Sequence, residues 1–193
     1  MGQAKNRSKE IAMLKQFDSI VDKFVAQRNK YNRYGGGIFR ANNVRRTNTG
    51  EYNKCVSNAD AYVSNNNRIA PAFGWILVYN EYSNEVEIMA HMWNLDCNRD
   101  IMFDSTPFAG NIKHFAYVWD SDMFAYYNEH HAQLDRTLPG ACYYDNDNFY
   151  KVIDMDPMTG HVLASEKFDT MYIQDFNWNP EYVNPYDDEV TYA

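Results

Sequence analysis

Apolar residues near the beginning of the chain recur at steps of three and four positions, which is typical of one face of a helix. We expect a helix over 8–31, with Ser8 as its N-cap. Three glycines at 35–37 break the pattern, and the polar stretch 40–54 has no period, so a loop is expected there. The apolar stripe of the helix consists of Ile11, Leu14, Phe17, Val21, Phe24 and Val25.

The pattern changes after this polar stretch. Apolar residues on one helical face predict a short helix from Cys55 to Val63, which Pro71 prevents from continuing. Three short apolar runs separated by turns follow, at 74–79, 86–95 and 101–104. They predict an antiparallel meander. We therefore expect an α+β fold in which an antiparallel sheet packs on the Cys55 helix.

The remainder of the chain gives weaker signals. Residues 121–134 are expected to form a helix, and 149–154 and 161–165 a hairpin around a turn. No internal repeat is present. We divide the chain into an N-terminal basic helix with its glycine loop (1–37), an α+β domain (38–176) and an acidic extended tail (177–193).

Composition places the chain among ordinary globular proteins. It has 193 residues, of which 45% are hydrophobic and 23% charged. No apolar run reaches the roughly 18 residues of a membrane-spanning helix, and the polar start does not resemble a secretory signal. Three cysteines are too few for a disulfide framework, so a reducing cytoplasm is the expected compartment.

Charge is unevenly distributed. Residues 1–54 carry 12 Lys and Arg against 4 Asp and Glu, whereas residues 55–193 carry 6 against 22. The acidic body should repel polyanions, which disfavours duplex nucleic acid as a partner. The basic helix is expected to lie on the acidic body or to be solvated. A composition rich in Asn and Tyr and poor in Leu is the bias of AT-rich genomes; a phage origin, and thus a host cytoplasm, is a hypothesis from it.

Three residues together suggest a nucleophilic site. Cys55 is expected at a helix start, His91 in the second strand of the meander and Asp104 at the end of the third. A helix N-terminus favours a thiolate and can stabilise an oxyanion. A histidine could take the thiol proton, and a carboxylate on the next strand, about 4.8 Å away, could orient the imidazole. Each residue also has a simpler interpretation: a core cysteine, a core or surface histidine, and an aspartate that forms an Asx turn.

Further residues extend the match to a known family. After the cysteine come Gly74-Trp75, then His91-Met92-Trp93-Asn94, then Asp104-Ser105-Thr106-Pro107. With 36 residues from cysteine to histidine and 13 from histidine to aspartate, this order resembles the transglutaminase-like branch of the papain-like thiol enzymes over about residues 50–110.

The resemblance implies a papain-like fold and a cofactor-free enzyme that hydrolyses amides or transfers their acyl group through a thioester. Cys55 would be the nucleophile, His91 the general base and acid, and Asp104 the orienting carboxylate. The substrate would be a protein, a peptide or a small amide. Some members of this branch only bind, so an inactive module that engages a host protein is an alternative.

The donor to the oxyanion is left open. Papain-type enzymes use an upstream glutamine, but no glutamine lies between Gln27 and Cys55. Asparagine amides could replace it. Trp75 and Trp93 are expected in the core, where they could also wall the site. The candidates for oxyanion or substrate contacts are Asn53, Asn48, Asn43, Asn94, Trp75 and Trp93.

The sequence leaves two further alternatives to weigh, a structural zinc site and a structural role in a virion. A structural zinc site would use ligands that lack the usual close pairs, so no metal is expected. A virion-associated structural protein, assembled through the N-terminal helix, is the second. The residues considered as zinc ligands are His91, Cys97, His130, His131 and Cys142.

Overall fold

The computed structural model describes residues 2–52, 54–80, 85–107, 114–130, 141–156 and 162–176. Within them lie the helices α1 (Gly2–Lys30), α2 (Cys55–Asn65) and α3 (Ser121–His130) and the 3-10 helix η1 (Ile173–Asp175). The strands are β1 (Ile38–Ala41), β2 (Arg45–Arg46), β3 (Ile69–Asn80), β4 (Glu85–Asp96), β5 (Ile101–Asp104), β6 (Phe115–Asp120), β7 (Ala141–Asp145), β8 (Asn148–Met155) and β9 (Val162–Lys167).

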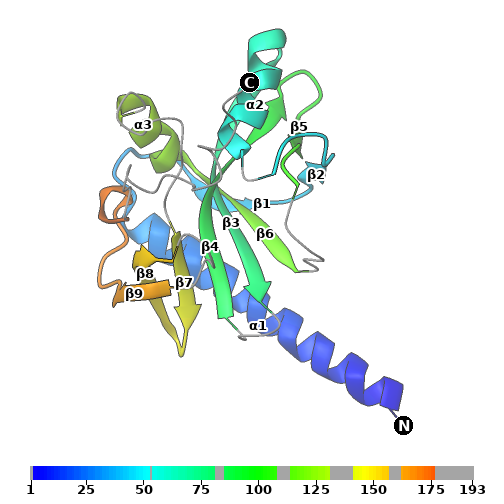
Figure 1. Cartoon of the computed structure of the whole chain (residues 1–193), viewed down its shortest axis with the longest axis vertical. Helices are drawn as coiled ribbons and strands as arrows, with labels where there is room; N and C mark the ends of the chain where they lie inside the picture. The colour runs from blue at the N-terminus through cyan, green and yellow to red at the C-terminus, as the bar shows by residue number, and fades with distance from the viewer. Residues whose placement is uncertain are drawn as a thin grey trace, which may run out of the picture.

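The described strands form one mostly antiparallel sheet, so the expected α+β class and N-terminal helix are confirmed (Figure 1). Its order is β1-β6-β3-β4-β7-β8-β9, and β5 pairs with β4. The two-residue β2 pairs with β5 in parallel. The expected meander is β3-β4-β5, in which Gly74 lies opposite His91 and Asn94 opposite Phe103. The meander thus fixes the position of His91 relative to Asp104.

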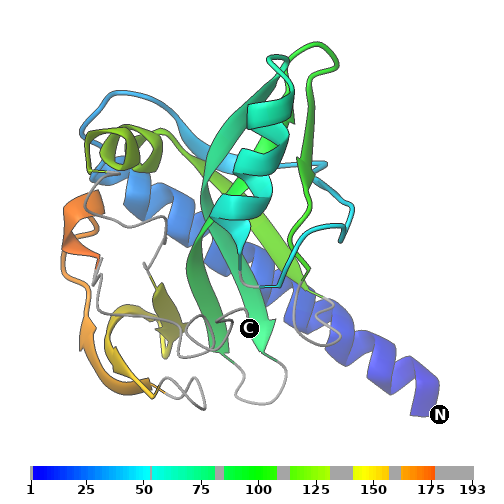
Figure 2. The same ribbon diagram turned by 45° about the horizontal axis from the view of Figure 1, so that its top comes forward.

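Side chains of β3 alternate between two buried clusters, as the pleat of a strand requires. The main core takes Phe73, Trp75 and Leu77. The second core takes Ala72, Ile76, Val78, Trp93 and Tyr117. Helix α1 crosses the sheet (Figure 2) and α2 packs beside β4; both contribute to the main core. Their residues in it are Phe17, Ile20, Val21, Phe24, Val56 and Ala59.

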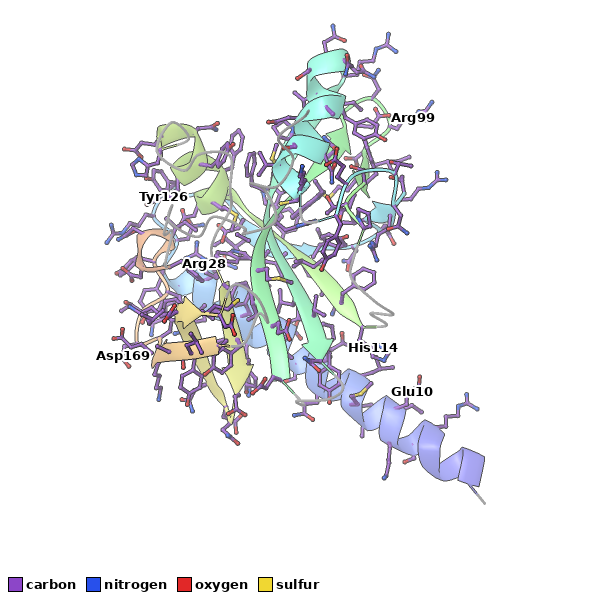
Figure 3. All side chains as sticks on the ribbon, in the orientation of Figure 1. Glu10, Arg28, Arg99, His114, Tyr126 and Asp169 are labelled. Atoms are coloured by element: carbon purple, nitrogen blue, oxygen red, sulfur yellow. The ribbon has the colours of Figure 1, made fainter. Side chains whose placement is uncertain are left out.

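Helix α1 begins earlier than its apolar stripe. We expected its start at Ser8, which is wrong, because the helix extends back to Gly2. The first buried side chain of the stripe is Phe17, whereas Ile11 is exposed, so only the later part of the stripe marks where the helix packs on the sheet. The preceding part projects into solvent, as Glu10 shows in Figure 3. No described helix is both long and apolar enough to cross a bilayer.

Other differences concern short strands. The stretch 40–54 was expected to be a loop, but it contains the end of β1 and all of β2. Strands β6 and β7 were not predicted. The hairpin of β8 and β9 was predicted and is confirmed; Lys151 lies opposite Glu166 in it. The tail 177–193 and residues 131–134 of the predicted helix lie outside the described residues.

A buried charge cluster, here called the Arg28 cluster, joins α1 to β6 and α3. Arg28, Asp120 and Asp122 are all fully buried. Nε of Arg28 donates to Oδ2 of Asp120 at 2.9 Å, and a terminal nitrogen donates to Asp122 at 3.3 Å. The guanidinium also donates to the carbonyl of Met171, and Nε1 of Trp75 donates to Asp120 at 2.6 Å. These contacts fasten α1, β6, α3 and the segment with Met171 around the Arg28 guanidinium. Figure 3 labels Arg28 in the interior of the protein.

Candidate active site

Cys55 is the first residue of α2 and is half-buried. The N-cap residue, Lys54, makes no side-chain hydrogen bond to the first turn. Backbone N–H groups at a helix start have no partner within the helix. The thiol therefore lies where the backbone can stabilise negative charge.

Asn58, one turn along α2, fastens two loops beside this helix start. Its Oδ1 accepts from the backbone N–H of Glu51 at 2.8 Å, and its Nδ2 donates to Oγ1 of Thr106 at 3.1 Å. The N–H of Gly50 donates to the carbonyl of Ser105 at 2.8 Å. The segment that follows Asp104 is thereby held against α2.

His91 lies on β4 and is only 6% exposed. Its Nε2 is 2.8 Å from Oδ2 of Asp104. Burial alone would lower the pKa of the imidazole, but hydrogen bonds to Asp104 and to Cys55, with their negative charges, raise the pKa of His91 to about 10. Asp104 and Cys55 thus both favour the protonated form of the imidazole.

Asp104, at the end of β5, is fully buried and accepts from three donors. Its Oδ2 meets His91 and also accepts from the hydroxyl of Tyr117 at 2.6 Å. Its Oδ1 accepts from the N–H of Thr106 at 2.9 Å, which is an Asx turn. Burial would raise the pKa of Asp104, but the bonds from His91, Tyr117 and Thr106 lower it. The residues Cys55, His91 and Asp104 are called the relay below. The relay and the Asx turn use different oxygens of the Asp104 carboxylate.

The raised pKa of His91 predicts a pH-dependent stability. Imidazole in an unfolded chain titrates near pH 6.5, whereas folded His91 keeps its proton up to about 10. In a Cys55→Ser protein no thiol can lose a proton that would offset this one, and the bond to Asp104 still raises the pKa of His91. The folded state then binds more protons above pH 6.5, so the free energy of unfolding should fall as pH rises, by up to about 1.4 kcal/mol per pH unit. Urea unfolding of Cys55→Ser from pH 6 to 9 measures this fall. Adding His91→Gln should remove the excess slope; an equal slope in both proteins would contradict the assignment.

The predicted site residues fall into two groups. Cys55, His91 and Asp104 lie together, and the ring of Trp93 stacks with the imidazole at 6.2 Å between centroids. Trp75 lies in the main core, where it packs against α1 and donates to the Arg28 cluster. Trp93 is therefore the tryptophan that contacts the relay.

The asparagine candidates have different surroundings. Asn94 is fully buried, and its Nδ2 donates to the carbonyl of Ala59 at 3.0 Å, while its Oδ1 has no hydrogen-bond partner in the described part of the chain. Asn48 accepts from Arg46 at 2.9 Å. Asn43 is exposed, with a φ of 65°. Asn53 lies outside the described residues.

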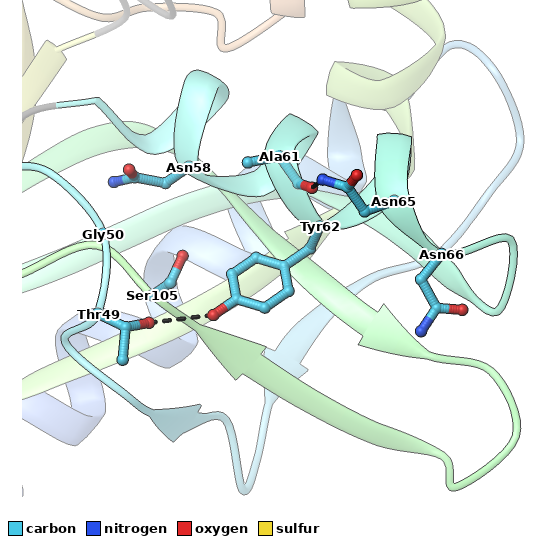
Figure 4. Close-up of a pocket in the computed structure, with 8 residues that line it drawn as sticks. All are labelled: Thr49, Gly50, Asn58, Ala61, Tyr62, Asn65, Asn66 and Ser105. Atoms are coloured by element: carbon cyan, nitrogen blue, oxygen red, sulfur yellow. Dashed lines mark hydrogen bonds between the residues drawn. The ribbon is translucent and has the colours of Figure 1, made fainter.

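An open pocket of about 500 Å³ lies along α2, between this helix and the two fastened loops (Figure 4). Tyr62 crosses it and meets Oγ1 of Thr49 at 3.1 Å. Neither Cys55 nor His91 lines it. Its polar side chains are uncharged hydroxyls and amides. The lining residues are Thr49, Gly50, Asn58, Ala61, Tyr62, Asn65, Asn66 and Ser105.

Tyr117 is the main site residue that the sequence did not reveal. It lies on β6, a strand absent from our expectations, and nothing near it in the sequence has catalytic spacing. The apolar run Ala116-Tyr117-Val118 could have signalled a buried strand. A buried tyrosine hydroxyl needs a partner, but only the fold shows that the partner is Asp104.

The described ligands of the zinc alternative lie on separate elements. Cys142 is buried in β7, Cys97 is exposed in a turn, and His130 ends α3. Within the described ranges, no three His, Cys, Asp or Glu side chains gather closely enough to hold a metal ion.

Comparisons of the chain with protein-family models, with curated proteins and with solved structures give no match. The geometry around Cys55 is therefore the basis on which a function can be proposed.

Proposed function

We propose that this protein is a thiol-dependent amide hydrolase or acyltransferase of the papain-like, transglutaminase-like kind. The observation that supports it most is the buried bond between Nε2 of His91 and Oδ2 of Asp104, next to a Cys55 thiol that also raises the pKa of His91. This order of sulfur, imidazole and carboxylate is what activation of a thiol requires.

The chemistry follows from the positions of the atoms. Sγ of Cys55 attacks the carbonyl carbon of an amide, and the carbonyl electrons move onto oxygen, which the N–H groups at the start of α2 stabilise. His91 donates its proton to the amide nitrogen, and the C–N bond breaks to leave a thioester and a free amine. Water or a second amine then attacks the thioester, gives its proton to His91, and releases the thiolate.

Asp104 orients this exchange without taking a proton itself. Its carboxylate holds Nε2 of His91, which leaves the other ring nitrogen to exchange a proton with the thiol. Trp93 stacks with the imidazole and shields the relay from water. The neutral amides and hydroxyls of the pocket along α2 suit a peptide or another uncharged polar substrate.

Selective alkylation of Cys55 tests the proposal without knowledge of the substrate. An ordinary thiol is less than about 1% ionised at pH 6, so a thiolate held by an imidazolium should react with iodoacetamide roughly 10- to 100-fold faster. Peptide mass mapping gives the separate rates of Cys55, Cys97 and Cys142. Cys97 is a stringent internal control, because it is more exposed than Cys55.

The matched variants are His91→Gln and Asp104→Asn, which should slow labelling of Cys55 and leave that of Cys97 unchanged. If Cys97 reacts as fast as Cys55 in the wild-type protein, the nucleophile is misassigned. An inactive binding module for a host protein, or a structural virion component, would then account better for the chain.

A further inference from the structure

Tyr117 contacts the relay at the carboxylate of Asp104 and beside the ring of His91. It is 3% exposed and lies in the second core, with its ring centroid 5.3 Å from that of Trp93 and 6.0 Å from that of His91. Its hydroxyl donates to Oδ2 of Asp104 at 2.6 Å. This is the same oxygen that lies 2.8 Å from Nε2 of His91.

We propose that Tyr117 is a positioning residue of the relay, whose hydroxyl sets how strongly Asp104 holds the imidazolium of His91. The inference rests on the proposed function and extends the relay from three residues to four. It assigns to β6 a part in the chemistry that neither α2 nor the meander supplies.

The geometry of the carboxylate carries the argument. The N–H of Thr106 occupies Oδ1, so the carboxylate of Asp104 cannot rotate to give Tyr117 and His91 separate oxygens. Two donors must therefore share the charge on Oδ2. Each donor weakens the bond to the other, because both draw on the same lone-pair density. The tyrosine thereby limits the stabilisation that Asp104 gives to the imidazolium.

The surrounding charges keep Tyr117 a donor. Burial raises the pKa of its hydroxyl, and the charge of Asp104 raises it further, whereas Arg46 opposes these effects. Arg46 lies on β2, directly opposite Asp104 in the parallel pair. The other ionisable group that bonds to the carboxylate is His91 on β4. The phenol therefore stays protonated at every pH at which the thiol is tested.

Removal of the hydroxyl should shift the ionisation of the thiol. In Tyr117→Phe the full charge of Oδ2 faces His91, so the imidazolium is better neutralised by Asp104 and stabilises the thiolate of Cys55 less. The acid limb of the pH profile for alkylation of Cys55 should move up by about 0.5–1 pH unit, and labelling at pH 6 should slow roughly 3- to 10-fold.

Tyr144→Phe is the matched control. The hydroxyl of Tyr144 on β7 also donates to a carboxylate, that of Asp147, at 2.7 Å, but it does not touch the relay. Its pH profile should coincide with that of the wild-type protein. A purely structural tyrosine at 117 would give the same result as this control, because lost stability does not shift the ionisation of a thiol in the folded protein.

Replacement of Tyr117 by 3-fluorotyrosine is a second, independent test of the proposal. The fluorinated residue keeps the ring and the hydroxyl but is a stronger donor, so the acid limb should shift in the opposite direction to that of Tyr117→Phe. Opposite shifts support the proposal. An unchanged profile in both variants, or in the fluorinated protein alone if Tyr117→Phe does not fold, overturns it while selective labelling of wild-type Cys55 stands. Loss of that wild-type selectivity would overturn the proposed function and this inference together.

Discussion

Arg28→Ala is expected to destabilise the protein by about 3–5 kcal/mol, a large part of the stability of a typical domain. The guanidinium is the cation that neutralises the fully buried Asp120 and Asp122. Without it, two carboxylates remain buried with only neutral donors around them. Burying these unpaired charges costs much more free energy than the ion pair itself contributes to stability. Urea unfolding followed by circular dichroism measures the loss.

A solvent-exposed ion pair of the same helix provides the control. Arg40 donates to Asp18 on α1 at 2.7 Å, and both side chains are open to water. Arg40→Ala should therefore cost no more than about 1 kcal/mol. If the losses from Arg28→Ala and Arg40→Ala are equal, the buried cluster does not hold α1 on the sheet. Neutralising Asp120 and Asp122 to asparagine in an Arg28→Met background should restore part of the stability.

Gly74→Ala is expected to be nearly as damaging, by about 3 kcal/mol, although it adds a single methyl group. A Cβ at this position would lie 1.9 Å from the carbonyl oxygen of Val118 and 2.9 Å from the ring of Trp93. The first obstacle is backbone of β6, which cannot turn aside as a flexible side chain can. Strands β3 and β6 must separate next to His91, so both the unfolding midpoint and the labelling rate of Cys55 should fall.

Gly37→Ala is the matched substitution, because a Cβ there meets only the ring of Phe39 at 3.4 Å. We expect a change within about 0.5 kcal/mol. The contrast separates the close approach of two strands from the general effect of replacing glycine. A loss of comparable size at both glycines would show that Gly74 has no special spatial role.

The sequence predicted those elements whose stabilising contacts are local. The stripe from Phe17 to Phe24 and the apolar runs of β3 and β4 carry their own period, so they are visible without the fold. Strand β2 could not be found in this way. Arg45 and Arg46 are polar, and they form a strand because they pair with β5. The start of α1 was misplaced for the opposite reason: a helix can continue where no apolar stripe marks it.

The residues of the candidate site could be proposed where their spacing along the sequence resembles that of a known family. Cys55, His91 and Asp104 were proposed from their expected elements, their order and their spacing. Nε2 of His91 lies 2.8 Å from Oδ2 of Asp104, and Cys55 begins α2 and influences the pKa of His91. Trp75 and Trp93 could not be told apart, because one residue of strand register decides which face each takes. Tyr117 was invisible, since its role depends on a contact between β5 and β6 that no local pattern encodes.

The strand order has a consequence for biosynthesis. β6 lies between β3 and β1, so α1 and β1, made first, find their place in the sheet only after β6 has emerged from the ribosome. Phe17 of α1 packs on Tyr79 of β3. Phe24 of α1 packs on Trp75 of β3 and on Phe149 of β8. Until these strands emerge, the two phenylalanines lack their partners and offer a binding site for chaperones. The meander of β3, β4 and β5 closes short loops and can nucleate early, whereas docking of the N-terminal helix is a late, long-range event that should limit the folding rate.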